Sequence, residues 1–128
     1  MMIGLGIDII DNRRIKKTID RFGNKFVERC FTINEINISN QKQNSTSYFA
    51  KRFAAKEACA KAMGTGLVKN INWKDIEVMN DINGKPYINL YNKALSSFKK
   101  MSKKECNILL SLSDERNYSI ANVSIFEL

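Results

Sequence analysis

The sequence predicts a single α+β domain, residues 1–128, in which one long central helix packs on a small, mainly antiparallel sheet. The segment from Tyr48 to Met63 holds six alanines and no Gly or Pro, which predicts the strongest helix of the chain. The pair Asn83-Gly84 predicts a tight hairpin turn between two short apolar segments. Two further apolar segments, 108–112 and 118–126, flank a polar turn and predict a C-terminal strand pair.

The N-terminal part predicts a strand followed by short helices. Residues 3–10 form an apolar segment typical of a buried strand, and the cap pair Asp11-Asn12 follows it. Apolar residues then recur at helical spacing until Gly23, and residues 26–30 continue as a second short helix. Thr32 and Glu35 fit a capping box that starts another helix.

The rest of the chain alternates between loops and regular elements. Residues 39–47 are polar, show no periodicity and predict a loop. After the long helix, Gly64 and Gly66 provide a helix end. Short strands are expected around Ile76 and Val78 and over 87–90, and the last helix is marked by Leu95, Phe98 and Met101.

Composition and charge narrow the possible functions. The chain carries 21 basic and 13 acidic residues, a net charge of +8, which predicts an anionic partner: nucleic acid, an acidic membrane surface, an acidic protein or a phosphorylated small molecule. The absence of histidine excludes Ser-His-Asp and Cys-His nucleophiles and His-ligated zinc. Three cysteines without CxxC spacing indicate a reduced, cytoplasmic protein. No segment is apolar enough for a membrane helix, and the N-terminus is unlike a signal peptide.

Asp8 is the first candidate for a functional site because it interrupts an apolar strand. An ionised carboxylate there is costly unless a partner compensates its charge. One interpretation is an Asp at a strand end that accepts hydrogen bonds from nearby backbone, and the other is a ligand for a hard metal cation.

A second candidate lies on the long helix, where Phe53, Glu57 and Lys61 share one face at i,i+4 spacing. Taken alone, Glu57 and Lys61 are best explained as a surface ion pair worth about 0.3 kcal/mol. The turn Gly64-Thr65-Gly66 admits a ligand close to the backbone, but taken alone it is better explained as a helix end, because the dipole at a helix C-terminus is unfavourable for anions. Lys85, in the hairpin turn, is within reach of a phosphate.

Four segments, taken together and in this order, resemble the 4′-phosphopantetheinyl transferases, and in particular the small bacterial holo-[acyl-carrier-protein] synthases. The resemblance extends over nearly the whole chain, including Arg14, Glu28-Arg29 and the tail from Ser111 to Arg116. The four segments are Gly6-Ile7-Asp8-Ile9, Arg52-Phe53-Ala54-Ala55-Lys56-Glu57-Ala58 with Lys61-Ala62, Gly64-Thr65-Gly66, and Asn83-Gly84-Lys85-Pro86.

The resemblance implies a Mg²⁺-dependent enzyme that moves 4′-phosphopantetheine from coenzyme A to a serine of apo acyl carrier protein. The released product is adenosine 3′,5′-bisphosphate, and the reaction serves fatty acid biosynthesis. Asp8 and Glu57 would be the metal ligands, with Glu57 and Lys61 catalytic. Coenzyme A contacts are implied for seven residues: Arg52, Lys61, Gly64, Thr65, Lys85, Pro86 and Ser113.

The resemblance also implies partners. Arg14, Lys25 and Arg29 would dock the acidic carrier protein, and the chain would form a homotrimer with active sites at subunit boundaries. No nucleic acid or membrane is expected as a partner. Some members of the family carry a histidine where Asp114 stands, so the role of Asp114 stays open.

Two other classes of function fit part of the sequence. A small basic nucleic-acid-binding protein accounts for the net charge but gives Asp8 and Glu57 no role, and aromatic residues are only 9%. An inactive adaptor that only binds acyl carrier protein would have no use for Asp8, Glu57 and Lys61.

Overall fold

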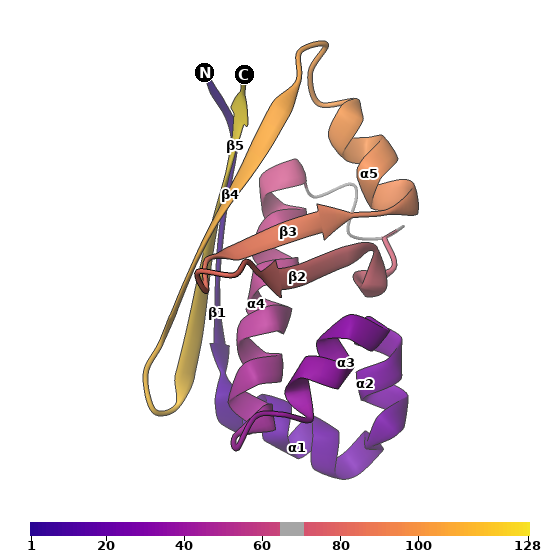
Figure 1. Ribbon diagram of the computed structural model, residues 1–128, viewed down its shortest axis with the longest axis vertical. Coiled ribbons are helices and arrows are strands. Elements are labelled where there is room, and N and C mark those ends of the chain that lie inside the picture. Colours follow the sequence, from indigo (N-terminus) through magenta and orange to yellow (C-terminus); the bar gives the residue numbers. More distant parts are fainter. Residues whose placement is uncertain (65–70) are drawn as a thin grey trace.

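The computed structural model describes residues 1–64 and 71–128, so the predicted coenzyme A contact at Thr65 and the predicted helix end at Gly66 lie outside the described residues. Figure 1 shows the helix α4 (Ser45–Met63) running along the middle of the molecule, with the longer strands on one side and the remaining helices on the other. The other elements are β1 (Met2–Asp11), α1 (Asn12–Phe22), α2 (Asn24–Cys30), α3 (Ile33–Ser39), a 3₁₀ turn (Trp73–Asp75), β2 (Ile76–Asn80), β3 (Pro86–Leu90), α5 (Asn92–Lys99), β4 (Cys106–Asp114) and β5 (Tyr118–Glu127).

The strands form two antiparallel sheets rather than one. The larger sheet has the order β1-β5-β4, with Asp8 opposite Ala121, and α4 packs on one of its faces. The hairpin β2-β3 forms a separate two-stranded sheet that lies across α4 (Figure 1). The predicted α+β class, the central helix and the antiparallel pairing are confirmed, whereas the division into two sheets was not expected.

Strand β1 crosses α4 at very short range because it presents glycine to the helix. A Cβ atom at Gly4 would overlap the carbonyl oxygen of Ala62, and one at Gly6 would overlap that of Ala58. Side chains alternate across a strand, so Asp8 points to the same helix two residues further on. The glycines therefore bring Asp8 close to α4.

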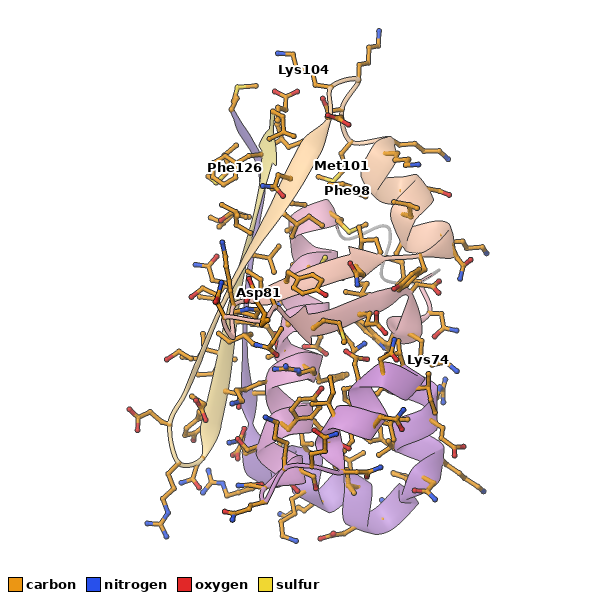
Figure 2. All side chains as sticks on the ribbon, viewed as in Figure 1. Lys74, Asp81, Phe98, Met101, Lys104 and Phe126 are labelled. Carbon is orange, nitrogen blue, oxygen red and sulfur yellow. The ribbon has the colours of Figure 1, made fainter. Side chains whose placement is uncertain are left out.

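The core divides into two apolar clusters. One joins the alanine face of α4 to the larger sheet and the β2-β3 hairpin. Phe98 and Met101 pack against this cluster from the side of α5 (Figure 2). The other cluster joins α1, α2 and α3 to the first half of α4, and Phe26 stacks on Phe53 within it with a ring separation of 6.1 Å.

The helix ends agree with the sequence at most positions, but the beginning of α4 differs. The capping box of Thr32 and Glu35 is present, and Asp11 caps α1. Helix α4 begins at Ser45 instead of Tyr48, because the side chain of Asn44 accepts a hydrogen bond from the Ser47 backbone and extends the helix into the polar stretch. Within the two described ranges, no helix has both the length and the apolar character needed to span a membrane.

Candidate active site

Asp8 and Lys61 form the centre of a charged cluster between β1 and α4. The Lys61 ammonium lies 2.9 Å from Asp8 Oδ1 and also donates to the carbonyl oxygen of Ile7 at 3.1 Å. Asp8 is only 8% exposed, and its Oδ2 is buried without a hydrogen-bond partner in the described part of the chain. A buried carboxylate oxygen without a donor is costly, so this atom marks a place where a cation or donor would bind.

Glu57, one turn before Lys61, belongs to the same cluster. Burial and the neighbouring carboxylate of Asp8 raise the pKa of Glu57 to about 7, while the charges of Lys61 and Arg14 act in the opposite direction. The expected surface ion pair of Glu57 with Lys61 is not formed among the described residues, because Lys61 turns to Asp8. Two carboxylates and one ammonium thus meet at one point.

These carboxylates face a pocket of about 350 Å³ between β1, α1 and α4. Its lining includes Arg14 of α1 and the aromatic rings of Phe26 and Phe53. Arg14 is therefore next to Glu57 in space, although the sequence separates them widely. The stacked phenylalanines give the pocket an apolar wall that strengthens charge interactions inside it.

The two carboxylates match the donor set of Mg²⁺. Among the described residues no group of three His, Cys, Asp or Glu side chains converges, so a dedicated protein cage for a metal ion is absent there. Mg²⁺ is typically held by one or two carboxylates, while water and substrate phosphates complete its octahedral coordination. The orphaned Oδ2 of Asp8 beside Glu57 fits that pattern.

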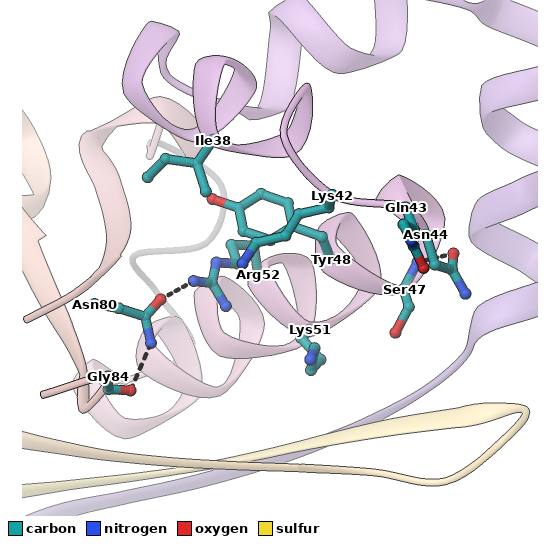
Figure 3. Close-up of a pocket in the computed structure, with 10 residues that line it drawn as sticks. All are labelled: Ile38, Lys42, Gln43, Asn44, Ser47, Tyr48, Lys51, Arg52, Asn80 and Gly84. Carbon is teal, nitrogen blue, oxygen red and sulfur yellow. Dashed lines mark hydrogen bonds between the residues drawn. The ribbon is translucent and has the colours of Figure 1, made fainter.

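Arg52 lines a second pocket, of about 590 Å³, between α4, the segment that joins α3 to α4, and the β2-β3 hairpin (Figure 3). Its guanidinium lies 4.3 Å from the centre of the Tyr48 ring, and the residue is only 5% exposed. Within residues 1–64 and 71–128 no carboxylate pairs with Arg52, while Lys42 and Lys51 add positive charge to the same pocket. A buried cation without a counter-ion favours an anionic ligand.

A smaller pocket of about 290 Å³ adjoins this one and shares Arg52 with it. Pro86 and Asp114 line the smaller pocket, and Asp114 lies 3.9 Å from the Lys51 ammonium. Lys85 is exposed in the turn, and Ser113 is exposed near the end of β4. Gly64 ends α4 with a φ of 115°. The structure therefore gathers Arg52, Pro86 and Asp114 but does not place Ser113 or Gly64 in these two pockets.

The Arg52 pocket and the Asp8 pocket share no lining residue. Sequence reasoning missed Tyr48 and Asn80, which hold Arg52 in its pocket. Tyr48 stands out in the sequence only as the expected start of a helix, and Asn80 has no local signal at all. Their importance comes from tertiary contacts.

Comparison with known proteins identifies the family. Residues 4–123 match the model of the 4′-phosphopantetheinyl transferase superfamily. The chain belongs to this superfamily. It is 46% identical to the holo-[acyl-carrier-protein] synthase of Bartonella henselae over 98% of this chain and 96% of that protein.

Two solved structures support the same assignment for the fold. The synthase from Neisseria meningitidis superposes with a TM-score of 0.86 at 36% identity, covering 99% of this transferase chain and all of the other. A holo-(acyl-carrier-protein) synthase from Bacillus anthracis, described in complex with CoA (3′,5′-ADP), superposes with a TM-score of 0.81 at 38% identity. This match covers 100% of this chain and 99% of the other.

Proposed function

We propose that this chain is a holo-[acyl-carrier-protein] synthase, which transfers 4′-phosphopantetheine from coenzyme A to a serine of apo acyl carrier protein. Adenosine 3′,5′-bisphosphate is the second product, and the reaction serves fatty acid biosynthesis. The observation that carries the proposal is the buried, unpartnered Oδ2 of Asp8 beside Glu57 and Lys61. Relatives of nearly full coverage that bear the name of this enzyme support it.

The metal part of the proposal is Mg²⁺ held by Asp8 and Glu57. Asp8 and Glu57 would hold the ion, and its chemistry there would be charge neutralisation for the pyrophosphate. Two carboxylates in one pocket repel each other, and this repulsion helps to raise the pKa of Glu57. A divalent cation would relieve it.

Lys61 and Glu57 are the catalytic side chains of the proposal. The Lys61 side chain is half exposed, and its ammonium is held by the Ile7 carbonyl and by Asp8, which lines the pocket. In that position it stabilises the negative charge that grows on the transferred phosphate. The chain has no histidine, so Glu57 is the side chain that we propose to accept the proton of the serine hydroxyl.

Coenzyme A would bind with its nucleotide at the Arg52 pocket. The uncompensated charge of Arg52 and the lysines beside it favour phosphate groups there. Lys85 and Pro86 in the hairpin turn, Ser113 on β4, and Gly64 and Thr65 after α4 complete the proposed contacts, with Lys61 at the reacting phosphate.

A homotrimer is also part of the proposal. Leu5, Ile7 and Ile9 of β1 are each about 60% exposed and point away from α4, so the part of the sheet's outer face that β1 forms is apolar. A second copy that covered this face would remove apolar surface from water. Since the Arg52 and Asp8 pockets share no residue, we place the active site where the Arg52 pocket of one subunit meets the Asp8 pocket of the next.

The oligomer is tested by replacing Ile7 with Asp and measuring molar mass by light scattering. We expect the wild-type chain to have the mass of three subunits and the Ile7→Asp variant that of one. A wild-type monomer, or an unchanged molar mass in the Ile7→Asp variant, would refute association through the outer face of β1.

The carrier protein would dock on α1 and α2. Arg14, Lys25 and Arg29 are exposed on these helices, and Phe26 borders both the pocket that Arg14 lines and the pocket that Arg29 lines. This basic surface lies beside the carboxylates, which suits an acidic protein that must bring its serine there. A cytoplasmic location is proposed from three cysteines that are all free of disulfides.

The decisive experiment measures the mass of apo acyl carrier protein after incubation with this chain, coenzyme A and Mg²⁺. We expect a gain of one phosphopantetheine arm with the wild-type chain and none with Asp8→Asn or Glu57→Gln. Asp20→Asn is the matched control, since Asp20 is an exposed carboxylate that pairs only with Lys16 in the described structure. A carrier protein of unchanged mass with the wild-type enzyme would refute the function, and activity in the Asp8 or Glu57 variants would refute their roles.

A further inference from the structure

Asn80, the last residue of β2, connects Arg52 to the hairpin turn. Its Oδ1 accepts a hydrogen bond from Arg52 Nη2, and its Nδ2 donates to the carbonyl oxygen of Gly84 at 2.9 Å (Figure 3). We propose that Asn80 is a positioning residue that orients Arg52 for a phosphate group of coenzyme A and holds the turn beside it. The inference rests on the proposed function.

The residue type at this position suits the task. A carboxylate would hold Arg52 equally well, but it would also cancel the positive charge that a phosphate needs. Asparagine is neutral, so it orients the guanidinium and leaves its charge available. On its other side the guanidinium lies over the Tyr48 ring, which is another neutral contact. Arg52 is thus held by two uncharged groups in a pocket where it is 95% buried, and its Nε has no partner in the described residues.

The turn is closed by its own hydrogen bonds. Asp81 Oδ1 accepts from the backbone N–H groups of Asn83 and Lys85, each at 2.9 Å, and the Gly84 N–H donates to the Asp81 carbonyl. Gly84 has a φ of 84°, which glycine adopts without strain. The turn is therefore internally braced, and Asn80 fixes its position relative to Arg52. Loss of Asn80 would release both groups at once.

The test compares Asn80→Ala and Asn80→Asp with the control Ile82→Ala, whose side chain is fully exposed in the same turn. For Asn80→Ala we expect the KM for coenzyme A and the inhibition constant of adenosine 3′,5′-bisphosphate to rise about tenfold, the size of one hydrogen bond to a charged group. The kcat and the KM for the carrier protein should stay within about twofold of wild type. Asn80→Asp should weaken the binding of coenzyme A at least as much, because the new carboxylate would pair with Arg52 and cancel its charge.

A double-mutant cycle separates positioning from a general structural effect. In an Arg52→Met background, Asn80→Ala should change the KM for coenzyme A by less than about twofold, since the group it orients is gone. A tenfold effect that persists in that background would overturn the inference, as would an unchanged KM in the single Asn80→Ala variant. If the wild-type chain transfers nothing, the proposed function fails, and titration of each variant with adenosine 3′,5′-bisphosphate still decides the role of Asn80.

Discussion

Replacing Lys56 with Met should cost about 3–5 kcal/mol of unfolding free energy, the usual penalty for removing one partner of a buried ion pair. Lys56 and Glu35 are both completely buried, and the ammonium lies 2.8 Å from Glu35 Oε1. The ammonium also donates to the backbone carbonyls of Trp73 and Ile76, so Lys56 anchors the start of β2 to α4 one residue before Glu57. Burial outweighs the attraction of Glu35 and lowers the pKa of Lys56.

The magnitude follows from what Glu35 keeps after the change. Its carboxylate still accepts from the backbone N–H groups of Thr32 and Val78, each at 2.9 Å, but the balancing charge is gone. Two backbone carbonyls lose their donor as well. Methionine has nearly the length of lysine, so little cavity is created. A whole domain has only about 5–15 kcal/mol of stability, so this single change should threaten folding at 37 °C.

Urea unfolding at fixed protein concentration, followed by the fluorescence of the single tryptophan, Trp73, measures the cost. The exposed Lys17→Met is the control and should stay within about 0.5 kcal/mol of wild type. Adding Glu35→Gln to Lys56→Met should recover part of the loss, because the unbalanced charge is removed. A Lys56→Met protein within about 1 kcal/mol of wild type would refute the buried pair as the anchor of β2.

Three further predictions address catalysis, docking and pH. Lys61→Met should lower kcat by on the order of 10²–10³ with little change in the KM for coenzyme A; an effect on KM alone would make Lys61 a binding residue. Lys25→Glu should raise the KM for the carrier protein at low salt, and much less at ~0.5 M salt, where charges are screened. Equal KM values for the variant and the wild type at low salt would contradict docking at Lys25. Lys25 is a cleaner probe than Arg14, because Arg14 lines the Asp8 pocket. Burial acts to raise the pKa of Glu77, but hydrogen bonds such as that from Thr32 prevail and hold this pKa below 4.5. The ionised Glu77 therefore stabilises the fold above pH 4.5, and this stabilisation is lost on further acidification. Glu77→Gln should make the urea midpoint fall less steeply below pH 4.5, and an unchanged slope would exclude Glu77 as the source of the fall.

The elements that the sequence predicts correctly depend on local signals. Between Tyr48 and Met63 the many alanines and the absence of glycine favour a helix through intrinsic propensity alone. In the same way, Asn83-Gly84 favours a turn. The predicted beginning of α4 was wrong by three residues, because the side chain of Asn44 caps the helix and extends it into a polar stretch. Such a cap competes with loop formation by only about 1 kcal/mol, too little for composition to reveal.

The contacts within the candidate site could not be predicted from the sequence. Asp8 could be singled out because it interrupts an apolar strand, whereas Glu57 was singled out only by the resemblance to a known family. The interpretation of Glu57 and Lys61 as a surface pair failed, because the competing partner, Asp8, is 53 residues away and becomes available only when β1 crosses α4. The same holds for Asn80 and Arg52, which are 28 residues apart.

Strand β1 serves two purposes through its period of two. Its inward residues Gly4, Gly6 and Asp8 meet α4, and its outward residues Leu5, Ile7 and Ile9 form the apolar face that we propose for association. A slip of one residue in the pairing with β5 would exchange the two sets and remove Asp8 from Lys61. The glycines oppose that slip, because any side chain in their place would collide with the backbone of α4. The position of the proposed metal ligand and the character of the outer face therefore have one physical origin, the close contact of a glycine-bearing strand with an alanine-rich helix.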